Sequence, residues 1–302
     1  MLEESVAVIW AYTFTTQNKL EASDIHSTDE LEKLRENTDW FWIDCLEPND
    51  EELESIAEWL NEPDVKELIN ESRIFSRYVK VNEYIMISIP FVCFESKVVM
   101  HPIHVFAEKK TFVTIRSKDS SKSISNTLKT FQDCRSKLEC PAFSPFVISR
   151  LFYEATNENL DVAMRLRERI DAIEETALTK PADKRISKTV FTLKREISTL
   201  ERILWAQRGK MLSIKEGVVP TVKSSEMGKQ TLSYAISNVS RELSLISSYD
   251  NALDSVLSLQ DLGMIHRVER TLIYLTFVTL LVNIVMILLE VGIIDVLTSR
   301  GA

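Results

Sequence analysis

The first 117 residues alternate apolar and polar positions in short runs, a pattern that predicts β-strands. Four runs rich in β-branched and aromatic residues have strand character; they cover residues 5–12, 40–46, 78–91 and 103–117. The last run contains the short polar turn Glu108-Lys109-Lys110 between two apolar arms, which predicts a hairpin. A helix is expected after Pro48-Asn49-Asp50, which is favourable chemistry for a helix start. Together these elements predict a sheet covered by helices.

From about Pro145 the pattern becomes helical throughout. Residues 146–178 and 186–215 have the periodicity of two long amphipathic helices, separated by the break Lys180-Pro181-Ala182-Asp183. Beyond Pro220, only Gly263 interrupts a further helical stretch from residue 229 to residue 291. As a single helix this stretch would be roughly 95 Å long, at about 1.5 Å per residue. A helix of that length can connect a cytosolic domain to a bilayer.

The apolar positions of this long stretch recur at steps of three and four, which fits a heptad seam. They include Leu232, Ile236, Val239, Leu243, Ile246, Leu253, Leu257 and Met264. Asp250 and Gln260 interrupt the seam. A seam of this length is expected to pack on other helices, either those of the same chain or those of a symmetric copy.

Residues Thr271 to Leu289 form a run of 19 residues without a charge, long enough to cross the hydrocarbon core of a bilayer. Arg267 and Arg270 precede it, as is typical of a cytosolic flank. The predicted fold class is therefore α+β: a cytosolic α/β/α domain followed by long stalk helices that continue into a C-terminal transmembrane helix. The expected parts are a cytosolic α/β domain (1–143), amphipathic helices (144–227), a long stalk helix (228–270), the transmembrane helix (271–292) and a short extracytoplasmic tail (293–302).

Thr279, Asn283, Met286 and Glu290 recur at spacings of four, three and four, so they share one face of this helix. Leu272 and Leu275, or alternatively Thr276, extend the row toward the cytosol. An unsatisfied amide in the bilayer centre costs several kcal/mol, so Asn283 needs a partner or water. Two interpretations remain open: Asn283 bonds neighbouring helices together, or the row lines a wet path between symmetric helices.

Glu290 and Asp295 fall at the far end of the predicted membrane helix. In a symmetric bundle they would form acidic rings, a common arrangement at the mouth of a cation pore. In a monomer they would be interfacial charges only.

The charge distribution limits the partners that we expect. Residues 21–71 hold 18 acidic and 3 basic residues, whereas the whole chain has a net charge of −9. This segment is either a solvated acidic face or a field that attracts cations. Nucleic acid is not expected as a partner, because no basic stripe with interleaved aromatic residues occurs. The acidic N-terminus lacks the basic region of a signal peptide, which places the bulk of the chain in the cytosol.

No combination of residues in the sequence suggests catalysis, so an enzyme is not expected. Two Gly-Lys pairs, at Gly209 and Gly228, lack the Ser/Thr and the leading glycine of a phosphate-binding loop. His101 and His104 could form half of a metal site, but histidines beside a strand are more often structural. Cys45 lies in an apolar run and is expected to be a core thiol, as is Cys93.

Five segments, taken in order along the chain, resemble the CorA family of divalent-cation (magnesium) channels. They are WIDCLEPNDEELESIAEWL, VFAEKKTFVTIRS, FSPFVISRLFYEATNENLDVAMRLRERIDAIEE, ISKTVFTLKREISTLERIL and SLQDLGMIHRVERTLIYLTF. The resemblance spans nearly the whole chain. It implies an α/β cytosolic domain, a very long stalk helix that continues into the first membrane helix, and a pentameric assembly.

The resemblance also implies roles for residues of the membrane helix. An ungapped match at Leu275-Thr276 places six residues at the family's pore-lining positions: Leu272, Leu275, Thr279, Asn283, Met286 and Glu290. Asn283 then stands where an apolar gate residue is usual. Ile293-Ile294-Asp295 replaces the family's Gly-Met-Asn signature, with Asp295 at the position of the selectivity Asn. The family's second membrane helix does not occur before Ala302.

The family's regulatory metal site pairs an acidic residue near the start of the stalk helix with one on a neighbouring subunit. Residues 231–241 contain no acidic residue, and Asp250 and Asp254 are weak substitutes. The sequence therefore leaves the regulatory metal ligands unknown.

The leading functional expectation is a CorA-like divalent-cation (Mg²⁺) channel or transporter in the cell membrane, which moves ions passively as a homo-oligomer, expected to be a pentamer. Co²⁺, Ni²⁺ and Zn²⁺ are alternative ions, transported or sensed, and the expected partners are membrane lipid and further copies of the chain. The alternatives are a non-conducting, membrane-anchored sensor or accessory protein, and a truncated chain whose outer helix lies beyond Ala302.

Overall fold

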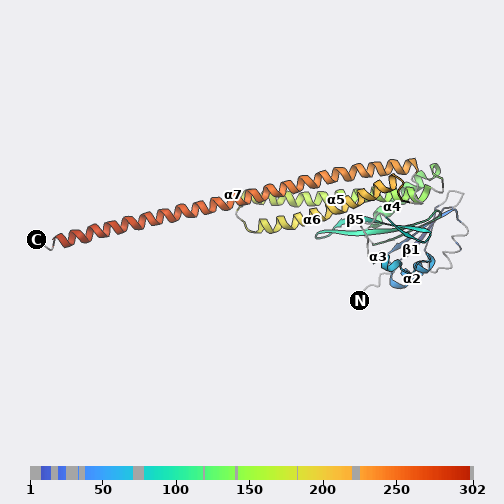
Figure 1. Cartoon of the computed structure of the whole chain (residues 1–302), viewed down its shortest axis with the longest axis horizontal. Coiled ribbons are helices and arrows are strands. Elements are labelled where there is room, and N and C mark those ends of the chain that lie inside the picture. The colour runs from blue at the N-terminus through green and yellow to red at the C-terminus, as the bar shows by residue number, and fades with distance from the viewer. Residues whose placement is uncertain are drawn as a thin grey trace. The chain divides into compact units, whose positions relative to one another are not determined.

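The structure of the protein is a computed structural model (Figure 1). It describes residues 8–14, 20–24, 33, 38–70, 78–117, 120–139, 142–181, 183–219 and 225–299, and side chains only up to residue 289. The chain divides into two compact units, and the long helices run through both. The first unit comprises residues 1–167 and 195–248, and the second comprises residues 168–194 and 249–302.

The first unit contains a seven-stranded mixed sheet in the order β2-β1-β3-β7-β6-β5-β4. The β3–β7 pair is parallel and the other pairs are antiparallel. The strands are β1 (Val8–Phe14), β2 (Leu20–Asp24), β3 (Trp40–Leu46), β4 (Val79–Val81), β5 (Tyr84–Phe94), β6 (Val98–Ala107) and β7 (Thr111–Arg116). The run predicted at 40–46 is thus confirmed, and so is the hairpin around Glu108-Lys109-Lys110, where Glu108 N–H donates to the carbonyl of Thr111 at 2.9 Å.

The strand character predicted for residues 78–91 is confirmed, and the run forms two strands, because β4 and β5 pair as a hairpin there. Asn82 turns the chain with a positive φ of 49°, a conformation that asparagine adopts more readily than most residues. Its side-chain amide donates to the carbonyl of Asn61 at 2.7 Å. An apolar pattern on both sides of a two-residue turn therefore resembles one long strand in the sequence.

Two short helices, α2 (Asp50–Trp59) and α3 (Val65–Asn70), cover one face of the sheet. The predicted helix start is confirmed: the Asn49 side chain accepts from Glu52 N–H, and the Glu52 carboxylate accepts from Asn49 N–H. This reciprocal capping satisfies two backbone donors that the first turn would otherwise leave unpaired. Behind it, Ile56 and Leu60 pack on Phe41 and other apolar side chains of the sheet.

The opposite face of β3 packs on α4 (Ser121–Cys134) and the start of α5 (Phe143–Thr179). Trp40 is fully buried there against Phe131 of α4 and Phe143 of α5, and its indole N–H donates to Ser144 at 2.9 Å. Because alternate residues of a strand point to opposite faces, side chains of β3 pack against both helical layers. The first unit therefore has the predicted α/β/α arrangement, and Figure 1 shows helices on both sides of the sheet.

The three long helices are α5, α6 (Arg185–Lys215) and α7 (Glu226–Ser299). They confirm the two amphipathic helices expected at 146–178 and 186–215, and the continuous helix expected after Pro220. The buried positions of α7 follow an alternating spacing of three and four: Leu232, Ala235, Val239, Glu242, Ile246, Tyr249, Leu253, Val256 and Gln260. Half of the predicted seam is thus correct. Ile236, Leu243 and Leu257 are only half-buried, and Met264 is exposed.

Gly263 of α7 allows the helix to approach the break between α5 and α6 in the second unit. A Cβ atom at Gly263 would lie 2.4 Å from the Pro181 Cβ, which is fixed by its ring. Gly209 in α6 offers the matched comparison, because a Cβ there would meet nothing within 4 Å. Alanine normally stabilises a helix interior relative to glycine by about 0.5–1 kcal/mol.

These two glycines are therefore expected to respond oppositely to the same change. Gly209→Ala should raise the thermal unfolding midpoint of the full-length protein in detergent, and Gly263→Ala should lower it because of the clash with Pro181. A Gly263→Ala variant that melts at or above the midpoint of the unchanged protein would contradict the close approach.

Candidate ion-conducting helix and its surroundings

The C-terminal half of α7 is the part of the described chain that is long and apolar enough to cross a membrane. Its most apolar segment has a mean hydropathy of 2.6 and is not buried by any other described part of the chain. Among the described side chains of α7, Gln260 is the last that is buried, and from residue 261 to residue 289 every described side chain is exposed or half-exposed. Bare apolar side chains in such number require a lipid or protein environment.

The helix places the predicted row of pore-lining residues, called the stripe below, on one face. At about 100° per residue, Leu272, Leu275, Thr279, Asn283 and Met286 fall within an arc of about 80°. Leu272, Leu275 and Met286 are each more than half exposed, with values of 56%, 62% and 55%. The expected alignment of these side chains is therefore a property of the regular helix. Their role as pore-lining residues remains a prediction.

The two polar side chains of the stripe differ in how they are satisfied. The Thr279 hydroxyl donates to the carbonyl of Leu275 at 2.8 Å, so its oxygen keeps only acceptor capacity for a ligand. The neighbouring Thr276 hydroxyl makes the same kind of bond to Leu272. The Asn283 amide forms no hydrogen bond with the described residues, which leaves both its donors and its acceptor available for water, an ion shell or another helix.

The acidic residues of the predicted pore mouth fall outside the described side chains. Glu290 lies in the helical part of α7, as does Asp295, but their side chains are outside the described set. Their assignment to acidic rings remains a prediction.

The carboxylates of Asp250 and Asp254 have an internal partner in the second unit. Lys194 Nζ of α6 lies 2.7 Å from Asp250 Oδ1 and 2.9 Å from Asp254 Oδ1. Burial lowers the pKa of Lys194, but the hydrogen bonds and charges of the two aspartates outweigh this effect and raise it overall. An ammonium group thus occupies the place between these carboxylates that a metal ion would need.

A buried polar cluster in the first unit was not anticipated from the sequence. Asn159 of α5 donates to Gln207 of α6 at 2.7 Å and to Glu242 of α7 at 3.1 Å. Gln207 also donates to the carbonyl of Pro90 in β5 at 2.7 Å. Burial raises the pKa of Glu242 to about 7, although the Asn159 hydrogen bond and the Arg241 charge lower it. The heptad spacing could have identified Glu242 as a buried position, because it lies seven residues after Ala235 and three after Val239.

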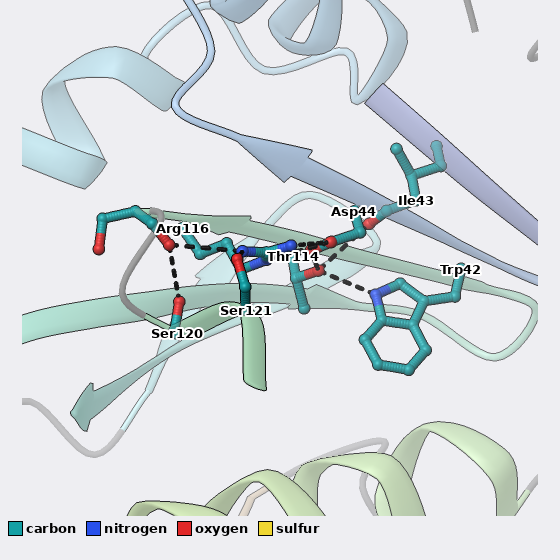
Figure 2. A network of polar contacts seen from close by, with 8 residues as sticks. Trp42, Ile43, Asp44, Thr114, Arg116, Ser120 and Ser121 are labelled. Carbon is teal, nitrogen blue, oxygen red and sulfur yellow. Dashed lines mark hydrogen bonds and ion pairs between the residues drawn. The ribbon is translucent and has the colours of Figure 1, made fainter. Parts of the chain in front are cut away.

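A second buried cluster joins two of the segments on which the family resemblance rests. Arg116 of β7 donates from Nε and Nη2 to the Asp44 carboxylate of β3, with the Nη2–Oδ2 distance at 2.7 Å. Thr114 donates to Asp44 Oδ1 at 2.6 Å and accepts from the Trp42 indole at 2.8 Å. Figure 2 shows the contacts that connect Trp42, Thr114, Asp44 and Arg116, and Arg116 also donates to the Ser121 hydroxyl of α4 at 2.7 Å. The cluster ties the central parallel strand pair to a helix.

The two histidines flanking Pro102 have different surroundings. His104 is buried, its Nδ1 lies 3.0 Å from the Ser88 hydroxyl, and burial together with the Lys210 charge lowers its pKa to about 4. This agrees with a structural role. His101 Nε2 instead lies 3.4 Å from a carboxylate oxygen of Glu95, and Cys93 Sγ completes a group of three ligand atoms within 4.8 Å of one another.

The group Cys93, Glu95 and His101 is a set of residues that could hold a metal ion at the β5–β6 hairpin. A thiolate, an imidazole and a carboxylate suit Zn²⁺ and related transition metals better than Mg²⁺. The expectation that Cys45 is a core thiol is confirmed, since it is fully buried and burial raises its pKa. The same expectation for Cys93 is wrong, because this residue is only half-buried near the hairpin end.

Comparisons with known proteins agree with this picture. A family model described as "CorA-like Mg2+ transporter protein" matches residues 37–284. The cobalt/magnesium transport protein CorA of Methanocaldococcus jannaschii is 20% identical over 227 residues, which cover 74% of this chain and 71% of that protein.

Solved structures show the same fold. The complete structure of the CorA magnesium transporter from Methanocaldococcus jannaschii has a TM-score of 0.68 at 16% identity, and covers 90% of this chain and 82% of that chain. The structure of the full-length CmaX protein has a TM-score of 0.67 at 15% identity, with the same coverage. At these identities the likeness shows the fold, which includes the cytosolic sheet and the long C-terminal helix.

Proposed function

Since the chain belongs to the CorA-like Mg²⁺ transporter family, we propose that it conducts Mg²⁺ passively along the Thr279–Asn283 face of α7. The protein is a membrane protein with a cytosolic N-terminal domain, and α7 provides its candidate membrane span. In the proposal, several copies surround one pore, with a pentamer as the expected assembly. The proposal also includes the domain boundaries expected from the sequence, which fall after residues 143, 227, 270 and 292.

The observation that carries the proposal is the exposed amide of Asn283 in the middle of an uncharged helix. No described residue satisfies this amide, and an unsatisfied amide in hydrocarbon costs several kcal/mol. A water-filled pore between symmetric helices satisfies it, because hydration water accepts and donates hydrogen bonds at the same time. Since Mg²⁺ releases its water reluctantly, amide and hydroxyl oxygens suit it as outer-shell partners.

The proposed path begins at Asp295 and Glu290, where acidic rings would concentrate cations before they meet Asn283 and Thr279. Met286, Leu275 and Leu272 form the apolar part of the same face. Co²⁺, Ni²⁺ and Zn²⁺ could follow the same path, because hydroxyl, amide and thioether groups exclude none of them.

A second candidate function is that of a non-conducting sensor or accessory protein anchored in the membrane. The observation that favours it is Ile293-Ile294-Asp295, which stands where the resemblance places Gly-Met-Asn. Such a protein would assemble in the membrane without carrying ions.

The test is Mg²⁺ uptake into liposomes that contain the purified full-length protein. Asn283→Leu should reduce uptake by about ten-fold, because it removes a charge-assisted contact worth about 1.5 kcal/mol or more. Asn283→Gln, which retains the amide, should keep most of the uptake.

Ile284→Leu is the matched control, because residue 284 lies about 100° away from Asn283 around the helix. This variant should transport normally. No uptake by correctly inserted, oligomeric protein would favour the anchored sensor, and equal uptake by Asn283→Leu would refute the assignment of the pore face.

A further inference from the structure

A basic cavity lies in the second unit, immediately before the membrane segment. It has a volume of about 840 Å³ and is formed by the break between α5 and α6 together with one face of α7. On α7 its lining residues include Gly263, Arg267 and Arg270, which share a face because their spacings are four and three. The α5–α6 break contributes Lys180 and Lys184.

The cavity keeps a strong positive charge after its internal pairs are counted. Asp183 is the acidic residue of the lining, and its carboxylate is bonded to Arg185, whose Nη2 lies 3.0 Å from Asp183 Oδ2. Hydrogen bonds from the Arg185 side chain and backbone lower the pKa of Asp183. Lys180, Lys184, Arg267 and Arg270 form no ion pair within the described residues.

Hydrogen bonds made by Gln260 of α7 hold the walls of the cavity together. The Gln260 amide accepts from the Ser187 hydroxyl at 2.7 Å and donates to the carbonyl of Asp183 at 3.3 Å. Gly263 and Pro181 allow the two walls to approach closely. The basic residues are therefore presented from a defined framework of three segments.

The position of the cavity relative to the bilayer follows from the sequence of α7. Gly263 and Arg270 are separated by about 10 Å along the helix, at about 1.5 Å per residue, and the uncharged run begins at Thr271. The headgroup layer on each side of the hydrocarbon core is about 5–8 Å deep. The basic residues thus occupy the depth at which lipid phosphates lie on the cytosolic side.

We propose that this cavity binds the headgroup of an anionic phospholipid of the cytosolic leaflet. A guanidinium group can bind a phosphate with two parallel hydrogen bonds. An ammonium group adds a positive charge with no preferred direction of approach. Clusters of four or more basic residues next to a membrane helix are typical sites for anionic lipids. The acyl chains of the bound lipid would extend along the apolar surface of α7 that no described residue covers. The proposal requires that α7 spans the membrane, but it does not require ion conduction.

The experiment measures lipid retention by the full-length protein in detergent, which keeps its outcome separate from any ion flux. Phosphatidylglycerol and phosphatidylcholine with identical acyl chains are added, and the bound lipid is quantified by native mass spectrometry. The protein should retain phosphatidylglycerol in preference to phosphatidylcholine. Lys184→Gln combined with Arg267→Gln should weaken phosphatidylglycerol binding about 25-fold, at about five-fold for each charge removed.

Arg202→Gln is the matched control, because Arg202 is an exposed arginine of α6 in the first unit; it should bind lipid as the unchanged protein does. Unchanged retention by the double variant, with an unfolding midpoint equal to that of the control, would overturn the proposal. Displacement of the bound phosphatidylglycerol by inorganic phosphate would overturn it too, because the cavity would then be a site for free anions. Retention of both lipids to the same extent would show that acyl chains alone are bound, against the proposal.

Discussion

Replacing Asp44 with alanine is expected to lower the free energy of unfolding by about 3–5 kcal/mol, because Arg116 would be left as an unpaired buried charge. The side chains of Asp44 and Arg116 are only 0% and 4% exposed. For a unit of this size the loss corresponds to a fall of about 6–20 °C in the thermal unfolding midpoint. Circular dichroism of the full-length protein in detergent measures that midpoint.

Two further variants show whether the loss comes from the buried charge. Asp44→Leu combined with Arg116→Met removes both charges, and it should recover much of the stability that either single change costs. Glu226→Ala breaks the exposed pair with Lys229 at the start of α7 and should leave the midpoint unchanged. If Asp44→Ala melted like Glu226→Ala, the buried pair would not stabilise the sheet.

Replacing Glu242 with glutamine is expected to change how stability depends on pH. The pKa of Glu242 is raised to about 7 in the folded protein, whereas a glutamate in an unfolded chain titrates near 4.3. The folded state therefore binds more protons between these values, and stability falls as the pH rises from about 4.5 through 7. The full change is on the order of 3 kcal/mol.

The glutamine variant keeps an acceptor for Asn159 but carries no charge, so it should be more stable than the unchanged protein at pH 8 and equal to it near pH 4.5. Unfolding midpoints of both proteins measured across this range give the difference that belongs to Glu242. His104 acts in the opposite direction in both proteins, since its pKa is lowered to about 4 and it destabilises the fold as the pH falls below about 6.5. Parallel pH profiles for the two proteins would show that Glu242 does not titrate in this range.

The elements that the sequence predicted correctly are those whose signal is local. Asn49 and Glu52 cap a helix from within four residues, and the polar turn at Glu108 joins two adjacent strands. The charge-free run after Arg270 is also visible without any tertiary information. By contrast, the pair of Asp44 and Arg116 is separated by 72 residues and meets only because β3 and β7 lie parallel.

The packed face of α7 shows why the site could be predicted only in part. Apolar side chains alone define an ambiguous seam, because positions such as Ala235 and Ile236 are neighbours around the helix. The structure selects the face that includes Glu242 and Gln260, since these polar groups find partners on α5 and α6. The stripe from Leu272 to Met286 could be placed on one face from spacing, but its pore role depends on further copies of the chain.

The close approach of Gly263 to Pro181 has a consequence for how this chain can vary in evolution. Any side chain at position 263 would collide with a ring that cannot rotate away. The two positions are therefore not free to change independently. Among homologous chains, a residue larger than glycine at position 263 should occur together with a changed or displaced residue at position 181, so the two positions should covary.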